Sequence, residues 1–158
     1  MPAIYTEEWY EACKELINQS KDVEKNAPRG NYKILAEIKG DPGSLYLSPG
    51  DDRHFVIRFE EGKCREYLQV PTLPPRKGFD FIFEMTAPIF EGVAAGLIDL
   101  VDAGLKGRIK VTGDMRILIR HAELVNAIYR IYTRDIETLW PKGKPAPAAS
   151  ATGSRPAH

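Results

Sequence analysis

The sequence predicts an α+β fold, in which a mostly antiparallel sheet carries its helices on one face. Two observations predict it. Between residues 32 and 85, four segments alternate apolar and polar side chains as half-buried strands do. From residue 86 to residue 140, apolar residues recur at helical spacing, interrupted by one short strand. With 158 residues, of which 43% are hydrophobic, the chain is long enough to bury one core.

The first 27 residues are expected to form two helices. Thr6 can cap the first helix, whose apolar stripe consists of Trp9, Cys13, Leu16 and Ile17. The second helix follows Ser20 and ends near Ala27, because Pro28 disfavours a helical conformation in the residue before it. The first helix therefore presents one apolar side to a core.

Four strands are expected at residues 32–39, 54–60, 63–70 and 79–85. A tight turn at Glu61-Gly62 joins the second and third strands into a hairpin, and the proline-containing segments 41–52 and 71–75 are loops. One face of the fourth strand carries Phe79, Phe81, Phe83 and Met85. Asp80 and Glu84 indicate that its other face meets water.

Residues 86–140 are expected to form a helix, a second helix, a strand and a last helix. Thr86 can cap the first of these helices, and a break near Gly96 separates it from the second. The strand covers residues 107–112. Asp114 caps the last helix, which reaches Trp140 and bends or splits near Ala122. Its broad apolar face comprises Ile117, Leu118, His121, Leu124, Val125, Ile128, Ile131 and Tyr132.

Charge balance, cysteine spacing and the acids within the apolar stretches argue against several classes of protein. The 22 Lys and Arg residues balance the 22 Asp and Glu residues, which gives no reason to expect a nucleic-acid partner. Cys13 and Cys64 have no metal-binding or redox spacing, so we expect free thiols and a cytoplasmic location. No secretory signal is visible at the start. The apolar stretch 87–105 contains Glu91, Asp99 and Asp102 and is predicted not to span a membrane.

The composition also predicts where the folded domain ends. Residues 1–140 are expected to form one domain. After Pro141 the chain consists mostly of Pro, Ala, Lys and Gly, which cannot bury enough apolar surface to order themselves. Residues 141–158 are therefore predicted to be a flexible Pro/Ala-rich tail.

One stretch resembles a known family. Residues 92–97 read Gly-Val-Ala-Ala-Gly-Leu, and residues 103–115 read Ala-Gly-Leu-Lys-Gly-Arg-Ile-Lys-Val-Thr-Gly-Asp-Met. The order of a small helix after an aromatic strand, a second helix, and a strand-to-helix junction at Gly113-Asp114-Met115 resembles the sterol carrier protein 2 domain family. The opening helix and the strands agree with that family's order, so the resemblance covers roughly residues 5 to 125. The chain departs from the pattern in having Ile98-Asp99 where the family often has Asn-Pro, and in its longer last helix.

The resemblance implies a five-stranded sheet covered on one face by helices, with an apolar tunnel between the layers. It implies non-catalytic binding and carriage of a hydrophobic ligand, namely a fatty acyl chain, an acyl-CoA, a sterol or a similar lipid, without a cofactor. The expected partners are this hydrophobic small molecule and, transiently, a membrane surface or an enzyme. The alternative is an accessory or interaction subunit of a larger enzyme complex, with the same fold and a closed core.

The residues expected to line the cavity lie on the aromatic strand and on the helices that follow it. They are Phe81, Phe83, Ile89, Phe90, Val93, Leu97, Val101, Leu105, Ile109, Leu118 and Leu124. Plain core packing uses the same residue types and is the alternative role. A basic cluster around the junction either is a solvated face or attracts an anionic head group or membrane surface; it consists of Lys106, Arg108, Lys110, Arg116 and Arg120.

No pattern of residues indicates catalysis, and the chain is expected not to be an enzyme. His54 lies on an outward strand face and His121 on the apolar side of the last helix, where a packed neutral histidine is common. No zinc spacing, phosphate-binding glycine loop or dinucleotide fingerprint is present in the sequence. An enzyme that acts on a hydrophobic substrate through these histidines is the third hypothesis.

Overall fold

The computed structural model describes residues 1–145, and its elements follow the predicted order. In chain order they are α1 (Glu7–Gln19), α2 (Lys21–Asn26), β1 (Asn31–Lys39), β2 (Arg53–Glu60), β3 (Lys63–Val70), β4 (Phe81–Thr86), α3 (Ala87–Ala94), α4 (Leu100–Leu105), β5 (Lys110–Gly113), α5 (Met115–Arg120), α6 (Ala122–Arg130) and a π-helical turn, η1 (Ile131–Asp135). Of the predicted tail, residues 146–158 lie outside the described residues. Within its first residues, the Lys142 amide donates a hydrogen bond to the Tyr46 hydroxyl over 2.9 Å.

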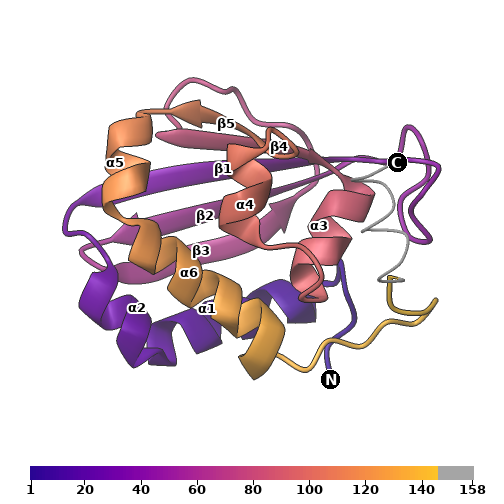
Figure 1. Ribbon diagram of the computed structural model, residues 1–158, viewed down its shortest axis with the longest axis horizontal. Helices are drawn as coiled ribbons and strands as arrows, with labels where there is room; N and C mark the ends of the chain where they lie inside the picture. The colour runs from indigo at the N-terminus through magenta and orange to yellow at the C-terminus, as the bar shows by residue number, and fades with distance from the viewer. Residues whose placement is uncertain (146–158) are drawn as a thin grey trace.

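The five strands form one mixed sheet in the order β3-β2-β1-β4-β5. Strands β1 and β4 are parallel, whereas the other three neighbouring pairs are antiparallel. The helices lie on one side of this sheet (Figure 1), and the main hydrophobic core lies between the two layers. The predicted fold class, a mostly antiparallel five-stranded sheet with helices on one face, is confirmed.

The face of the sheet that points away from the helices is more buried than Asp80 and Glu84 predicted. It holds a small buried cluster of Leu35, Val56 and Ile82. Because β3 and β4 are separated in the sheet by β2 and β1, residues 71–80 must cross the sheet to connect them. Arg76 in this crossing forms ion pairs with Glu37 on β1 at 2.7 Å and with Glu84 on β4 at 3.1 Å. The crossing segment therefore covers apolar residues that alternation assigned to solvent.

Side-chain caps fix the starts of three helices, at the predicted caps Thr6 and Asp114 and at Ser20, which was predicted only to precede a helix. Thr6 accepts from the amide of Trp9, Ser20 from that of Val23, and Asp114 from that of Arg116. Thr86 precedes α3 but makes no side-chain capping hydrogen bond.

The last helical region splits at His121, next to the predicted position, but it ends earlier than expected. Helical structure stops at Asp135 instead of Trp140. The reason is a second pairing of the chain. Leu139 lies in a parallel bridge with Ala3, and its amide donates to the carbonyl of Pro2 over 2.8 Å. Residues near the two ends of the domain are therefore held side by side by backbone hydrogen bonds.

One buried acid joins three segments of the chain. Glu91 on α3 is 3% exposed, and one of its carboxylate oxygens accepts hydrogen bonds from the Tyr5 and Ser44 hydroxyls, both at 2.7 Å. Burial raises the pKa of Glu91, and the two hydrogen bonds oppose this shift without cancelling it. The folded state therefore holds the Glu91 proton more tightly than the unfolded chain does.

This raised pKa predicts a pH dependence of stability. Between the unfolded-state pKa, near the ordinary value of 4.5, and the higher folded-state pKa, the folded protein binds more protons. The free energy of unfolding should therefore fall as the pH rises through this window, and the Glu91→Gln variant should lack that decline. Urea denaturation of both proteins between pH 4 and pH 7 measures the difference. Substitution of the exposed Glu15 by Gln on α1 is the control, and identical pH profiles for the wild type and Glu91→Gln would contradict the prediction.

Candidate ligand-binding cavity

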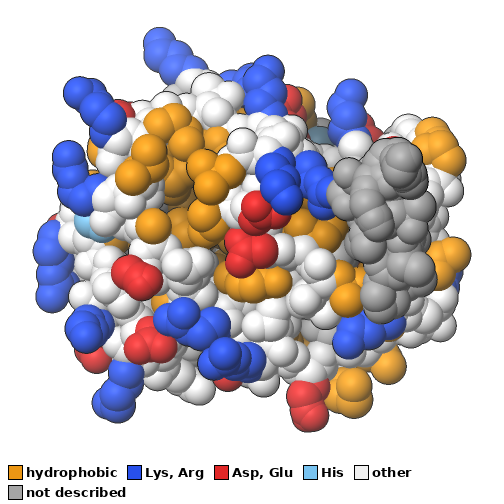
Figure 2. Space-filling model, in the orientation of Figure 1, with side chains coloured by type: hydrophobic (Ala, Val, Ile, Leu, Met, Phe, Trp, Pro, Cys, Tyr) orange, Lys and Arg blue, Asp and Glu red, His pale blue; other side chains and the backbone are white. Residues whose placement is uncertain are grey.

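An apolar cavity lies between the inner face of the sheet and the helices α3, α4, α5 and α6. Its volume is about 130 Å³, and it is partly open to solvent. Figure 2 shows a hollow of hydrophobic side chains in the region of α5 and α4, with Lys and Arg side chains around its outer side. The lining residues are Pro28, Tyr32, Ile34, Ala36, Phe55, Ile57, Phe59, Phe81, Phe83, Met85, Phe90, Val93, Leu100, Ile117, Leu118, His121, Leu124, Val125, Ile128 and Tyr132.

The strand register arranges the sheet wall of this cavity in rows. Ile34 on β1 lies between Ile57 on β2 and Phe81 on β4. In the next row, Ala36 lies between Phe55 and Phe83. Alternate residues of a strand point to the same face, so the pairing of three strands turns all these side chains toward the helices. The small side chain of Ala36 leaves space at the centre of the wall.

The opposite wall comes from α5 and α6. Seven of the eight members of the predicted apolar face line the cavity: Ile117, Leu118, His121, Leu124, Val125, Ile128 and, just after α6, Tyr132. No side chain of α5 is fully buried, because this face looks onto the cavity instead of onto packed atoms. His121 ends α5 and precedes α6, and its amide bonds back to the carbonyls of Ile117 and Leu118.

The structure brings together six of the eleven residues expected to line the cavity. These are Phe81, Phe83, Phe90, Val93, Leu118 and Leu124. Ile109 is 1% exposed and packs in the core, and Ile89 is half-buried against the core, so neither reaches the cavity. That any of the six contacts a ligand stays a prediction.

Three further expectations, at Leu97, Val101 and Leu105, share one error. Their spacing of four residues assumed a single helix from residue 97 onward, whereas α4 begins at Leu100 after a turn. The interrupted helix changes the direction of each side chain, so that Leu100 lines the cavity and Leu105 is 80% exposed. Glycine at position 96, with a φ of +79°, marks this turn.

Several residues line the cavity although they were not among the eleven predicted to do so, and for most of them the sequence pattern already indicated an inward position. Tyr32, Ile34 and Ala36 on β1, and Phe55, Ile57 and Phe59 on β2, follow the strand alternation that the sequence displays. His121, Val125, Ile128 and Tyr132 belong to the helical periodicity of the last region. Pro28 has no such signal, because only the tertiary fold places the end of α2 beside β1.

Polar atoms at the cavity come from three side chains, those of Tyr32, His121 and Tyr132. The Tyr132 hydroxyl is hydrogen-bonded to that of Tyr67, and burial raises the pKa of both tyrosines, which keeps them neutral. The lining includes no Asp, Glu, Ser, Cys, Lys or Arg. The arrangement can exclude water from an apolar molecule, and the potentially reactive side chains at the cavity are those of the two tyrosines and His121.

Reactive groups elsewhere in the domain are not organised into a second site. Cys13 and Cys64 are buried and free, and burial raises the pKa of the Cys64 thiol to about 12, so it remains protonated. Among residues 1–145, no cluster of His, Cys, Asp and Glu is arranged to hold a metal ion. The same residues contain no helix that is both long and apolar enough to cross a membrane.

Comparison with solved structures identifies the class of fold. A crystal structure of sterol carrier protein 2 superposes with a TM-score of 0.71 and 19% sequence identity, over 85% of this chain and 99% of that chain. The solution structure of a conserved hypothetical protein from Thermus thermophilus, whose name relates it to sterol carrier proteins, gives a TM-score of 0.70 at 18% identity, over 90% and 96% of the two chains. Neither a protein family model nor a curated protein sequence matches the chain. The chain has the sterol carrier protein 2 fold, and the resemblance seen in the sequence is confirmed at the level of the fold.

Proposed function

We propose that this protein binds and carries a hydrophobic ligand, such as a fatty acyl chain, an acyl-CoA, a sterol or a similar lipid, without catalysing a reaction on it. The observation that carries the proposal is the apolar cavity between the sheet and the helices α3, α4, α5 and α6. The similarity of the fold to sterol carrier protein 2 supports it. An accessory subunit would not need an open hollow of this kind, so the cavity favours a carrier over that alternative.

Burial of hydrocarbon supplies the affinity in this proposal. Each methylene removed from water contributes about 0.8 kcal/mol, so a chain of about ten methylenes gains roughly 8 kcal/mol before the costs of ordering. The cavity of about 130 Å³ is close in size to an engineered apolar cavity of roughly 150 Å³ that holds benzene. A longer ligand therefore extends through the opening or displaces the helical wall.

Delivery of the ligand to a membrane or to an enzyme requires no further site within the cavity. The two free, buried thiols are compatible with the reducing cytoplasm, where we place the protein. His54 is not among the residues that line the cavity, which argues against catalysis there by this histidine.

Filling the cavity should weaken ligand binding. Leu118→Trp adds bulk on the cavity side of α5, and we expect it to weaken the binding of a fluorescent fatty-acid probe at least about tenfold, since the ring takes the ligand's volume. Probe titration and native mass spectrometry of the purified protein measure this. Ile119→Trp is the matched control, because Ile119 is the next residue of the same helix and is 68% exposed. A wild-type protein that carries no lipid and binds no probe would refute the proposal, as would equal binding by Leu118→Trp and Ile119→Trp.

A further inference from the structure

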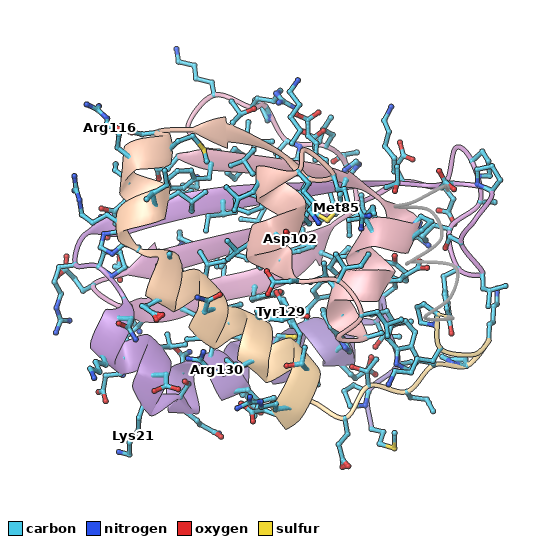
Figure 3. The ribbon with its side chains drawn as sticks, in the orientation of Figure 1. Lys21, Met85, Asp102, Arg116, Tyr129 and Arg130 are labelled. Carbon is cyan, nitrogen blue, oxygen red and sulfur yellow. The ribbon has the colours of Figure 1, made fainter. Side chains whose placement is uncertain are left out.

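The helices α5 and α6, residues 115–130, are held to the rest of the domain by few contacts, and we call them the α5–α6 arm. Ala127 is the only residue of the arm that is fully buried. Within the part of the chain that the structure describes, one side-chain ion pair joins the arm to another helix or strand. Arg130 on α6 lies on the side that faces α2 (Figure 3), 3.3 Å from the Asp22 carboxylate. Segments with few buried contacts open at a low free energy, so the arm can leave its place while the sheet stays intact.

Both ends of the arm are fixed. Before it, Gly113 at the end of β5 is so close to β4 that a Cβ atom added to the glycine would lie 2.4 Å from the Asp80 carbonyl oxygen. After it, Ile131 is buried in the core, and the Tyr132 ring stacks on that of Trp9. A segment that is anchored at both ends and loosely held between them moves as a lid.

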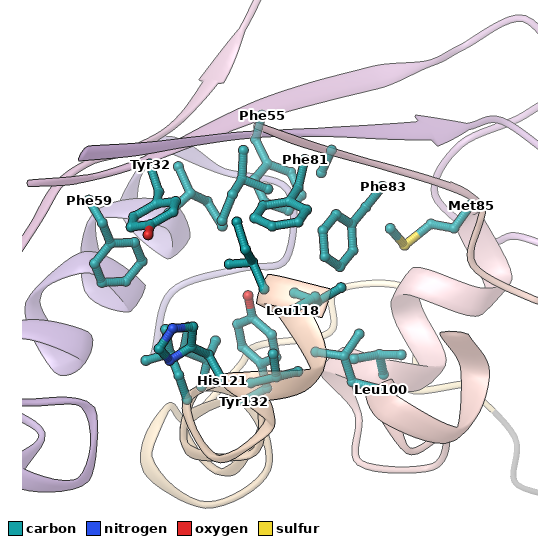
Figure 4. A pocket seen from close by; sticks show the side chains of 18 of the residues that line it. Tyr32, Phe55, Phe59, Phe81, Phe83, Met85, Leu100, Leu118, His121 and Tyr132 are labelled. Atoms are coloured by element: carbon teal, nitrogen blue, oxygen red, sulfur yellow. The ribbon is translucent and has the colours of Figure 1, made fainter. Parts of the chain in front are cut away.

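The arm forms the wall of the cavity opposite the sheet. Figure 4 shows Leu118 and His121 of the arm facing Tyr32 and Phe81 of the sheet. The arm also has a joint in its middle, because α5 ends at His121 and α6 begins directly after it. The cavity of about 130 Å³ compares with one that holds benzene, so a ligand with a long hydrocarbon chain needs more volume. Displacement of the arm supplies this volume without disturbing the aromatic core beneath α1.

We propose that the α5–α6 arm is a hinged lid, which pivots at residues 113–114 and 131–132 and is held closed by the ion pair between Arg130 and Asp22. This inference rests on the proposed function, because it assigns the moving part through which the cavity takes up a ligand larger than itself. The structure is the closed state. A ligand that fits only the open state binds more tightly when the closed state is less stable, whereas a ligand that fits the closed state gains nothing.

Arg130→Gln tests the lid without any ligand, because it removes a surface ion pair of modest strength. Hydrogen exchange of the full chain, followed by mass spectrometry, should show exchange in residues 115–130 that is about two- to fivefold faster, with β1–β4 and α1 unchanged. Asp22→Asn should have the same effect, and the double variant no more than either, because both remove one contact. Arg65→Gln is the matched control, since Arg65 forms a surface ion pair of the same length, 3.3 Å, with Glu60 on the β2–β3 hairpin.

Two ligands of different size test the consequence for binding. Arg130→Gln should raise the affinity for a long-chain fluorescent fatty-acid probe about two- to fivefold and leave the affinity for benzene unchanged. Equal gains for the probe and benzene would overturn the lid, as would unchanged exchange in residues 115–130 in both single variants or faster exchange throughout the domain. If neither ligand binds the wild type, the proposed function fails, and the exchange experiment still decides whether the arm opens on its own.

Discussion

Replacing Trp9 by alanine is expected to lower the free energy of unfolding by about 3–5 kcal/mol, a large part of the stability of a domain of this size. Trp9 on α1 is completely buried. Its ring stacks on Tyr132 with centroids 5.8 Å apart and meets Phe90 edge-on at 6.0 Å. Its indole N–H donates to the Thr138 hydroxyl over 2.9 Å. The substitution therefore opens a cavity among aromatic rings and leaves Thr138 without this donor.

Urea denaturation followed by far-ultraviolet circular dichroism measures this loss. Trp140→Ala is the matched control, because Trp140 is only partly buried and packs at the edge of the core against Tyr46. The control should lose clearly less stability, and Trp9→Phe should fall between the two. Since Tyr132 also lines the cavity, Trp9→Ala should weaken probe binding as well. Equal losses for Trp9→Ala and Trp140→Ala would show that α1 is not packed as described.

Gly40→Ala should destabilise the protein by about 2–3 kcal/mol, the cost of forcing extra volume into a packed site. A Cβ atom at position 40 would lie 1.9 Å from the carbonyl oxygen of Ser48, which is a backbone atom and cannot rotate away. The loop is held against Gly40 because the Asp41 amide donates to the Leu47 carbonyl over 2.9 Å, and Leu47 is 1% exposed in the core. Relief of the clash would therefore pull Leu47 from its place.

Gly50→Ala provides the contrast for this prediction. Gly50 lies in the same loop with a φ of +89°, and nothing lies within 4 Å of a Cβ added there. Only the left-handed conformation is unfavourable for alanine at that position, at a cost of about 1 kcal/mol. Denaturation midpoints of the two variants distinguish the causes. A larger loss for Gly50→Ala would mean that backbone conformation, and not the approach of Ser48, requires glycine in this loop.

Local signals in the sequence predicted most of the fold. Alternation placed β1, β2 and β3 within one residue of their observed limits, since each strand has one face toward a core. The predicted caps at Thr6 and Asp114 marked helix starts, because these side chains satisfy amides that the helix itself leaves free. The bridge of Leu139 with Ala3 was not predictable, because it joins residues far apart in the chain and depends on where the completed fold brings them.

The cavity was predictable in its walls but not in its details. Helical periodicity identified the side of α5 and α6 that lines it, and aromatic alternation identified Phe81 and Phe83. The direction in which the side chains of α4 point depends on the turn that precedes this six-residue helix. For this reason Leu100 lines the cavity, whereas Val101 and Leu105 do not. Whether facing apolar layers touch or remain apart depends on tertiary packing, which no local pattern encodes.

The α5 segment is where the domain should open most easily. It has six residues, none of them fully buried, and its carboxyl end is interrupted at His121. Local unfolding free energies are lowest where few apolar contacts must be broken. A molecule outside could therefore enter through a brief fraying of one helical turn while the sheet and α1 stay intact, and its uptake would be limited by that local motion and not by global unfolding.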